Sequence, residues 1–559
     1  MTANASSSSV TSPPDGPPPP APDRCAALRV DLAAHGLLPP LPAAFLAGRD
    51  HDLLAPLRFV MPGEVPHGNS LGALPGARRE LAEALAVSNR GYGHADADRM
   101  ARRLADPATR VVVTGQQPGL FGGPLYAFAK AMAAARWAAA LEAEGEPAVA
   151  VFWVATEDHD WDEVATASFL TGEGPRRFDL GKDPEPLTPV GMRALGPEVD
   201  GVLRQLAEAA PGEAYAEWIR EMARWYRPDA RFGEAFSRLM ARMLGPRCPL
   251  LLDAMHPALK SAQRPWLRRL VERRHELEEA FVRQDATVES RGYPLQISPQ
   301  RGASPLFLLR HGERRRVEWR GEDGYALRGR GDTAEGSVAD LLQTIDENPG
   351  VVSPGALARP VLQDAVLGSS LQVLGPAEVS YLTQVAPVYR LLEVEAPWIS
   401  LRPQTLVLEA KQAERLADLG LSLADVLGDR HALDAQLAER QGGGFVGPVR
   451  GEVEAALDGL REPALTVDTN LERPYEKTRE QILRALDTFA EKVQGAAARR
   501  DEVVSRRVEQ LRETCLPFGK LQERALSAAH FQGKYGDQLA AAYWEQMGLD
   551  PRFLQVVSF

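Results

Sequence analysis

Cysteine is scarce in this sequence. Only Cys25, Cys248 and Cys515 occur among 559 residues, and no two of them form a CxxC pair. A disulfide framework or a thiolate zinc site needs several closely spaced cysteines, so neither is indicated. Such usage is typical of a reducing compartment, and we expect the protein to be cytoplasmic.

Long apolar runs and dense basic blocks are also lacking. No stretch of roughly 18 consecutive apolar residues appears, so no membrane span is expected. The chain has 64 basic and 76 acidic residues, a formal net charge of −12, and no Lys/Arg cluster that could follow a phosphate backbone. We therefore expect neither a membrane nor a nucleic acid as partner.

The rest of the composition is that of a globular protein, with 44% hydrophobic and 25% charged residues. This length suffices for about two or three structural units. Residues 1–23, MTANASSSSVTSPPDGPPPPAPD, are rich in Ser and Pro and lack the basic and apolar regions of a signal peptide. We expect a disordered and dispensable tail there.

Residues 110–155 have the pattern of strand, loop, helix and strand. RVVVTG and PAVAVFWVA are continuous apolar runs, typical of parallel strands buried on both faces. Between them lie a Gly/Pro-rich loop, QQPGLFGGPLY, and an Ala-rich helix that ends at Gly145. This order predicts a βαβ unit with a right-handed crossover.

An acidic cluster, TEDHD, follows the second of these strands. Ligands bind beyond the carboxyl ends of parallel strands, so this cluster and the Gly-rich loop should face one crevice. The cluster has three possible functional interpretations: magnesium ligands, groups that orient an amine or hydroxyl substrate, or a histidine base oriented by a carboxylate. The alternative is a set of helix-capping acids with no ligand.

The Gly-rich loop is suited to an anion. Gly115, Gly119, Gly122 and Gly123 allow close approach of the backbone, and the following helix offers free N–H groups for phosphate or carboxylate. Lys130 lies one to two turns into that helix. The loop matches neither GxxxxGK[ST] nor GxGxxG, so a tight connection with nothing bound is the alternative.

Further strands are expected downstream. CPLLLDAMHP predicts a short buried strand ending near Asp253 and His256. GYPLQI and PLFLLRHGERRRVEWRGEDGYALRG alternate in strand fashion and predict an antiparallel insertion able to cover the crevice. SLQVLGPAE predicts a strand, a turn and a helix opened by Glu378.

Four polar residues lie in apolar company around this last helix: Arg359, Gln363, Tyr381 and Gln384. A buried polar group needs hydrogen-bond partners. Substrate and internal hydrogen bonding are equally consistent with the pattern.

Charged helices predominate from residue 410 to residue 513. A 3/4 spacing of apolar residues predicts a helical hairpin or coiled coil, with a mate between Ala413 and Leu437. The spaced residues are Ile482, Leu486, Phe489, Val493, Ala496, Val504, Val508 and Leu511. Dimerisation and a hairpin packed on its own core are equally consistent with this spacing.

Five long motifs occur in a familiar order: VVTGQQPGLFGGPLYAFAKA, VFWVATEDHDWDEV, ARPVLQD, LGPAEVSYLTQ and CLPFGKLQERALSAAHFQGKYG. Together they resemble the cysteine-adding enzymes of bacillithiol biosynthesis over nearly the whole chain after residue 24. The resemblance implies an α/β fold, with a Rossmann-like parallel-sheet core related to class I tRNA synthetases, inserted connecting segments and an α-helical coiled-coil domain that forms a homodimer.

The expected organisation follows from the patterns and the resemblance together. Residues 24–409 form the catalytic core, with insertions at about 165–350. Residues 410–513 form the coiled-coil domain, and residues 514–559 form a helical segment that docks on the core.

The resemblance implies a ligase that adds cysteine to the amino group of glucosaminyl malate. ATP, with magnesium, would activate the cysteine carboxylate as an adenylate or acyl phosphate. Asp158 and Asp160 would bind the amine or sugar hydroxyls, and His159 would take the proton. Substrate or nucleotide would contact Thr114, Gly115, Gln116, Gln117, Gly119, Gly122, Gly123, Tyr126, Lys130, Glu157, Arg359, Gln363, Gly375, Glu378, Tyr381 and Gln384; no residue is assigned to bind a metal.

Two departures and two alternatives accompany this hypothesis. HIGH and KMSKS signatures are missing, which leaves the adenylation step open, and neither crevice motif contains a cysteine for a covalent intermediate. A metal-dependent hydrolase or deacetylase would use the Asp/His cluster as ligands. A non-catalytic coiled-coil scaffold would need only the dimer.

Overall fold

The computed structural model describes residues 27–67, 75–298, 302–438, 446–500 and 502–559. The expected tail, 1–23, lies outside the described residues. Among the helices of these ranges, none combines the length and apolar character needed to cross a membrane.

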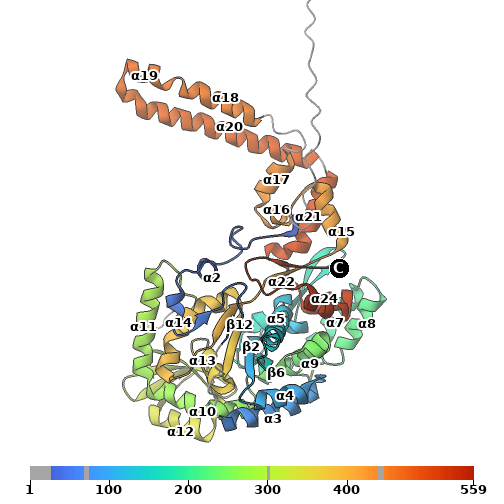
Figure 1. The fold of residues 1–559 in the computed structure, drawn as a ribbon, viewed down its shortest axis with the longest axis vertical. Helices are drawn as coiled ribbons and strands as arrows, with labels where there is room; N and C mark the ends of the chain where they lie inside the picture. Colours follow the sequence, from blue (N-terminus) through green and yellow to red (C-terminus); the bar gives the residue numbers. More distant parts are fainter. Residues whose placement is uncertain (1–26, 68–74, 299–301, 439–445, 501) are drawn as a thin grey trace, which may run out of the picture.

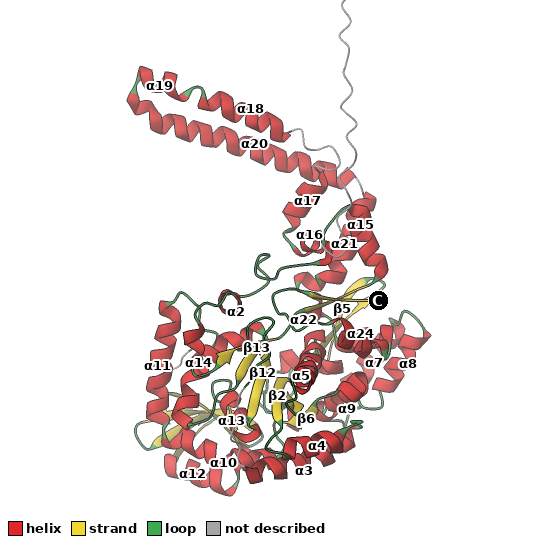
Figure 2. Ribbon diagram, viewed as in Figure 1, coloured by secondary structure: helices red, strands yellow, loops and turns green. Residues whose placement is uncertain are grey.

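A six-stranded parallel sheet forms the centre of the body (Figure 2), and its strand order is β1-β13-β12-β2-β3-β6. The predicted βαβ unit is confirmed: β2 (Arg110–Gln116) and β3 (Ala148–Val154) pair in parallel from Arg110↔Ala148 to Gln116↔Val154, joined by α5 (Leu125–Ala143). The remaining strands are β1 (Arg58–Phe59), β6 (Leu250–Asp253), β12 (Ser369–Leu374) and β13 (Trp398–Leu401). The chain leaves β2 toward β3 on one side and later adds β12 on the other, which places the topological switch point between β2 and β12.

Helices cover both faces of this sheet (Figure 1). Val112 and Phe152 are buried on the face that packs against α5 and α9 (Phe232–Leu244). Val111 and Val151 are buried on the opposite face. That face packs against α3 (Pro75–Tyr92), α4 (Ala97–Ala105), α10 (Pro257–Glu272) and α13 (Arg359–Leu367). Burial on both faces explains why these strands have continuous apolar sequences.

The predicted antiparallel insertion is a five-stranded sheet in the order β10-β9-β8-β7-β11. Its strands are β7 (Ala303–Arg310), β8 (Glu313–Arg320), β9 (Gly324–Arg328), β10 (Thr333–Ser337) and β11 (Val352–Pro354). The expected strand in GYPLQI is wrong, because residues 292–297 form a turn and irregular backbone. The Gln384 side chain accepts hydrogen bonds from the Gln296 and Ile297 N–H groups, and so replaces a strand partner.

The remaining elements of the body precede or surround these sheets. They are α2 (Pro40–Leu46), α6 (Trp161–Val164), β4 (Thr166–Thr171), β5 (Gly174–Asp179), α7 (Glu198–Glu208), α8 (Glu213–Met222), α11 (Arg274–Ser290), α12 (Val338–Glu347) and α14 (Pro376–Leu392). Glu378 occupies the first turn of α14, as expected, where its carboxylate accepts a hydrogen bond from the Gly375 N–H at 2.7 Å.

A helical arm projects from the body (Figure 1). It consists of α18 (Val446–Asp458), α19 (Arg461–Val467) and α20 (Glu472–Arg500). At its base lie α15 (Ala410–Leu419), α16 (Leu423–Leu427), α17 (Arg430–Ala438) and α21 (Glu502–Cys515). At the base of the arm, α17 packs on α20, and α15 and α16 pack on α21. The expected mate between Ala413 and Leu437 therefore contacts only this lower part of the hairpin. Farther out, α18 and α19 pack on α20.

The apolar stripe of the hairpin is unevenly buried. Val508 and Leu511 are buried at the base of the arm, whereas Phe489 is 55% exposed and Val467 at the tip is 82% exposed. The side chain of Ala496 lies outside the described part. The outer arm therefore presents apolar surface that its own helices do not cover.

The C-terminal segment returns to the body, as expected. It contains α22 (Gln522–Ala525), α23 (Ala528–Tyr535), α24 (Gln538–Gln546) and β15 (Gln555–Ser558), which pairs in parallel with β14 (Thr405–Leu408). α22, α23 and α24 pack on α5. This docking brings α22 to the carboxyl edge of the central sheet.

Candidate active site

A pocket of about 390 Å³ opens at the carboxyl edge of the central sheet, at the switch point between β2 and β12. The ends of β2, β3 and β12, the first turns of α5, α13 and α14, and the insertion sheet all contribute to it. It is lined by Gly115, Gln116, Gln117, Tyr126, Lys130, Trp153, Ala155, Glu157, Asp158, Glu163, Ala254, Arg314, Pro354, Gly355, Ala356, Arg359, Gly375, Pro376, Ala377, Glu378, Tyr381, Arg402 and Arg524.

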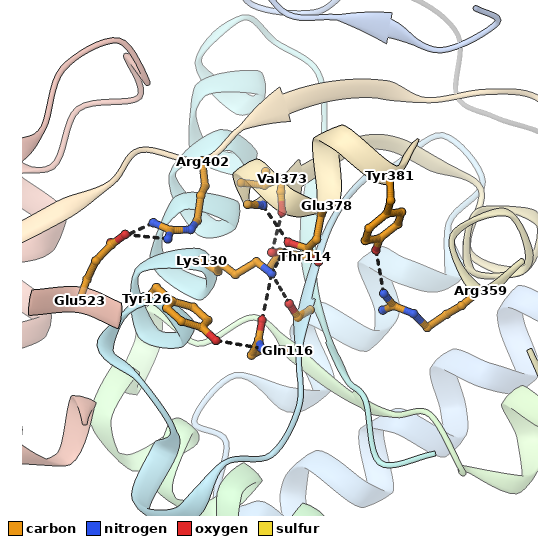
Figure 3. A network of polar contacts seen from close by, with 12 residues as sticks. Thr114, Gln116, Tyr126, Lys130, Arg359, Val373, Glu378, Tyr381, Arg402 and Glu523 are labelled. Atoms are coloured by element: carbon orange, nitrogen blue, oxygen red, sulfur yellow. Dashed lines mark hydrogen bonds and ion pairs between the residues drawn. The ribbon is translucent and has the colours of Figure 1, made fainter. Parts of the chain in front are cut away.

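Lys130 connects three elements beneath the pocket (Figure 3). Its ammonium group donates to the Gly115 carbonyl at 2.6 Å, Gln116 Oε1 at 3.2 Å and Glu378 Oε2 at 2.6 Å. Burial lowers the pKa of Lys130, and the Glu378 carboxylate opposes that shift. All three ammonium protons have acceptors in the protein, so Lys130 positions its neighbours and leaves no proton for a ligand.

Gln116 links Lys130 to Glu163. Its Nε2 donates to Glu163 Oε1 at 2.9 Å and to the Tyr126 hydroxyl at 3.2 Å. Because a lysine ammonium can only donate, Lys130 determines which end of the Gln116 amide faces Glu163.

One wall of the pocket is cationic. Arg359 donates to the Tyr381 hydroxyl at 2.9 Å, and Arg524 on α22 lies 6.0 Å from the centroid of the Tyr126 ring. Neither guanidinium forms an ion pair with a carboxylate in the described part of the chain. The first turn of α14, with Gly375, Pro376 and Ala377, lies in the same wall and adds the positive end of a helix dipole.

A second part of the lining, called here the acidic wall, contains Asp158 and Glu157 and has unsatisfied polar atoms. Asp158 Oδ2 accepts from Gln117 Nε2 at 3.0 Å, and Glu157 Oε1 accepts from the buried Lys260 Nζ at 2.5 Å. Glu157 Oε2, Gln117 Oε1 and Trp153 Nε1 are buried without a hydrogen-bond partner among the described residues. Buried polar atoms are costly when unpaired, so this wall is suited to a ligand with hydroxyl or ammonium groups.

His159 and Asp160 do not line the pocket. His159 Nδ1 lies 3.3 Å from Arg314 Nη1, its ring packs near Phe307, and burial together with the Arg314 cation lowers its pKa. Asp160 caps α6, because its Oδ1 accepts from the Glu163 N–H at 3.3 Å.

The Gly-rich loop is largely committed to the protein interior. The N–H groups of Gly119, Gly122 and Gly123 donate to the Gln117 carbonyl, the Tyr226 hydroxyl and the Leu120 carbonyl. Gly122 has a φ of +85°, and a Cβ there would lie 3.2 Å from Met243. These three glycines do not line the pocket, and the Leu125 N–H at the start of α5 donates to the Leu526 carbonyl.

Three other predicted residues have internal contacts. Thr114 Oγ1 donates to the Val373 carbonyl at 2.7 Å, which joins β2 to β12. Gln384 Nε2 donates to Asp285 at 3.0 Å, and Gln363 is buried on α13. The predicted residues that the structure brings together in the pocket are Gly115, Gln116, Gln117, Tyr126, Lys130, Glu157, Asp158, Arg359, Gly375, Glu378 and Tyr381.

Four charged pocket residues were not among the predicted ones: Glu163, Arg314, Arg402 and Arg524. Glu163 and Arg524 lie within two of the motifs quoted from the sequence, so their place in those motifs could have marked them as site residues. Arg314 belongs to the GERRRVEWR hairpin, whose arginines are typical of a solvated strand.

The described side chains that could bind a metal or react as thiols lie apart from one another. Within the described ranges, no group of three or more His, Cys, Asp or Glu residues could hold a metal ion. Cys248 and Cys515 are buried free thiols whose pKa values burial raises. Neither lines the pocket.

Family models match the chain in two adjoining parts. The model described as "Bacillithiol biosynthesis BshC, N-terminal Rossmann-like domain" matches residues 68–403, and "Bacillithiol biosynthesis BshC, C-terminal coiled-coil domain" matches residues 405–549. The chain belongs to the BshC family. This result confirms the resemblance inferred from the five motifs, and with it the Rossmann-like and coiled-coil fold.

Relatives in the BshC family match along most of their length. A Salinibacter ruber protein named "Putative cysteine ligase BshC" is 29% identical over 554 residues, 96% of this chain and 100% of that protein. A protein of the same name from Solibacter usitatus is 31% identical over 454 residues, 80% of this chain and 84% of its own.

Proposed function

We propose that the protein is a cysteine ligase of bacillithiol synthesis, joining the carboxyl group of cysteine to the amino group of glucosaminyl malate. Family membership and the names of the relatives support the reaction class. The observation that carries the proposal is the pocket between a cationic and an acidic wall, because the reaction brings an anionic activated carboxyl group to an amine.

The cationic wall fits phosphate and carboxylate groups. Arg359 and Arg524 have no carboxylate partner in the described ranges, and the first turn of α14 adds the positive end of a helix dipole to the same lining. ATP, when bound, would supply a leaving group for the cysteine carboxylate. Magnesium would arrive with the nucleotide phosphates, since the described side chains form no cluster for it.

The acidic wall fits the acceptor substrate. Asp158 and Glu157 attract an ammonium group, while the free Gln117 Oε1 and Trp153 Nε1 provide an acceptor and a donor for sugar hydroxyls. The two substrates would thus meet with their reacting groups between the walls.

The proposal extends to assembly and location. The exposed apolar residues of the arm support a homodimer formed through α18, α19 and α20. The two described cysteines are unpaired, which supports the cytoplasm as the site of action.

The test is a reconstitution with purified protein, glucosaminyl malate, cysteine, magnesium and ATP, omitting each component in turn. Mass spectrometry should detect a thiol product that depends on ATP, and the release of AMP or ADP identifies the activated intermediate. No ligation product, together with hydrolytic activity that needs no nucleotide and is abolished by chelators, would favour a hydrolase. No product in any combination, with Asp158→Ala tolerated in cells, would favour a scaffold.

Variants of the cationic wall sharpen the test. Arg359→Met and Arg524→Met should raise the KM for ATP or cysteine, because each removes a cation that faces the pocket. Arg204→Met changes an exposed arginine on α7, away from the pocket, and should leave the KM unchanged. Equal KM values in all three variants would contradict the assignment of this wall.

A further inference from the structure

Amide formation by the proposed ligase requires a proton acceptor beside the amine. The ammonium group gives one proton to a base, and its nitrogen then forms a bond with the acyl carbon of activated cysteine. The bond from that carbon to the phosphate oxygen breaks, the oxygen keeps the electron pair, and the second nitrogen proton passes to water. A group in the pocket must therefore accept the first proton.

Most pocket groups are already committed. Glu378 pairs with Lys130, and Glu157 pairs with Lys260. Burial raises the pKa of Tyr381 to about 12 and raises that of Tyr126 still further, so both phenols stay protonated.

Asp158 and His159 are held by the insertion sheet. Asp158 accepts from Gln117 and lies 3.9 Å from the Arg314 guanidinium, so both neighbours hold its carboxylate in place as an anchor for the ammonium group. His159 faces Arg314 outside the pocket lining.

We infer that Glu163 is the general base that takes the proton from the attacking amine, an inference that rests on the proposed ligase function. Its carboxylate lines the pocket at the rim, where an amine can reach it. Oε1 is held by Gln116 Nε2 at 2.9 Å, and Oε2 has no hydrogen-bond partner among the described residues. One oxygen is thus positioned and the other is available.

The surroundings of Glu163 prepare it for this role. The pocket wall removes part of its hydration, and this is the main reason that its pKa is raised to about 7. The negative charges of Asp160 and Asp158 also contribute to this rise. Lys130 on α5 opposes the shift, and Glu378 on α14 adds to it. Gln116 and Tyr126, which also face the carboxylate, are neutral. A base of this pKa is about half ionised at neutral pH and still binds the transferred proton well.

The test compares Glu163→Gln with Asp162→Asn in the reconstituted ligase. Asp162 is the preceding residue of α6, exposed and outside the pocket lining, so its variant removes the same charge from the same helix. Glu163→Gln should lower kcat with glucosaminyl malate by about 10²–10⁴-fold. It should also abolish the fall in kcat/KM that the wild-type protein shows as pH drops through about 7. Asp162→Asn should keep the wild-type rate and pH profile.

Hydroxylamine as acceptor separates the base from other roles. It is mostly unprotonated at neutral pH and needs no base to attack activated cysteine. Glu163→Gln should therefore form cysteine hydroxamate at close to the wild-type rate, which also reports that the variant is folded and activates cysteine.

Three results would overturn the inference. If Glu163→Gln keeps the wild-type pH profile, Glu163 is not the general base, while the proposed ligase function stands. Loss of hydroxamate formation in Glu163→Gln would assign Glu163 to activation or folding. If the wild-type protein forms no product at all, the proposed ligase function is wrong, and so is the role of Glu163 as its base.

Discussion

The buried guanidinium of Arg402 donates to both carboxylate oxygens of Glu523, at 2.9 and 2.6 Å. The Thr405 N–H donates to the same carboxylate at 2.9 Å. This contact fastens α22 to the segment that follows β13 (Figure 3). Arg524, the next residue along α22, owes its place in the pocket to this ion pair.

Glu523→Gln should destabilise the protein by about 3–5 kcal/mol, because it leaves the Arg402 cation buried without its counter-charge. Urea unfolding measures the loss. Glu272→Gln breaks the exposed pair with Arg268 and should cost less than about 1 kcal/mol. Equal unfolding midpoints in both variants would contradict a structural role for the buried pair.

Gly115→Ala should destabilise the body by about 1–3 kcal/mol, the usual cost of overpacking. A Cβ at this position would lie 2.7 Å from the Trp153 carbonyl oxygen and 2.8 Å from its Cβ, so β2 and β3 must separate. In contrast, Gly201→Ala on α7 meets nothing within 4 Å and should stabilise the helix by up to about 1 kcal/mol. Thermal unfolding of the two variants should shift in opposite directions.

His530 should make the protein less stable in mild acid. Burial lowers its pKa to about 3 in the folded state, against about 6.5 in an unfolded chain. Below pH 6.5 the unfolded chain binds a proton that the folded protein does not, so the free energy of unfolding falls as pH falls, until about pH 3. Between pH 7.5 and 5 the loss from this one group is about 2 kcal/mol.

His530→Gln isolates this effect, because a glutamine can keep a hydrogen bond to the Tyr215 hydroxyl and does not titrate. Urea unfolding at several pH values should show a shallower slope in the variant, by up to about 1.4 kcal/mol per pH unit. Parallel slopes would mean that His530 is protonated in the folded state.

Val467→Asp combined with Phe489→Asp should convert the proposed dimer to a monomer, because each places a charge on exposed apolar surface of the arm. Sedimentation equilibrium measures the mass. Val87→Asp changes a valine on α3 of the body that is 61% exposed, and it should leave the mass unchanged. A wild-type protein that is already monomeric would contradict the dimer.

The parallel core could be predicted because its strands bury both faces. RVVVTG and PAVAVFWVA are apolar throughout, and a Gly-rich loop and an Ala-rich helix lie between them, so local sequence determines this βαβ unit. The strand ends then place Gly115, Gln116 and Asp158 at one edge of the sheet without knowledge of the rest of the chain.

Two of the pocket arginines could not be predicted in the same way. Arg402 and Arg524 reach one pocket from segments on either side of the arm, and nothing local distinguishes them from surface arginines. Gln384 shows the opposite case. Its apolar surroundings suggested a ligand contact or internal hydrogen bonds, and the structure gives it Asp285 and the backbone of residues 296–297.

The order of the central sheet has a consequence for synthesis of the chain. Val111 on β2 pairs with Ser369 on β12, so a large part of the chain must be translated between the two strands. At bacterial or eukaryotic elongation rates the interval is roughly 13–50 s. During that time the edge of β2 that later pairs with β12 has no neighbouring strand. The pocket is completed later still, because Arg524 is translated near the end of the chain. We expect nascent chains to depend on chaperones through this interval.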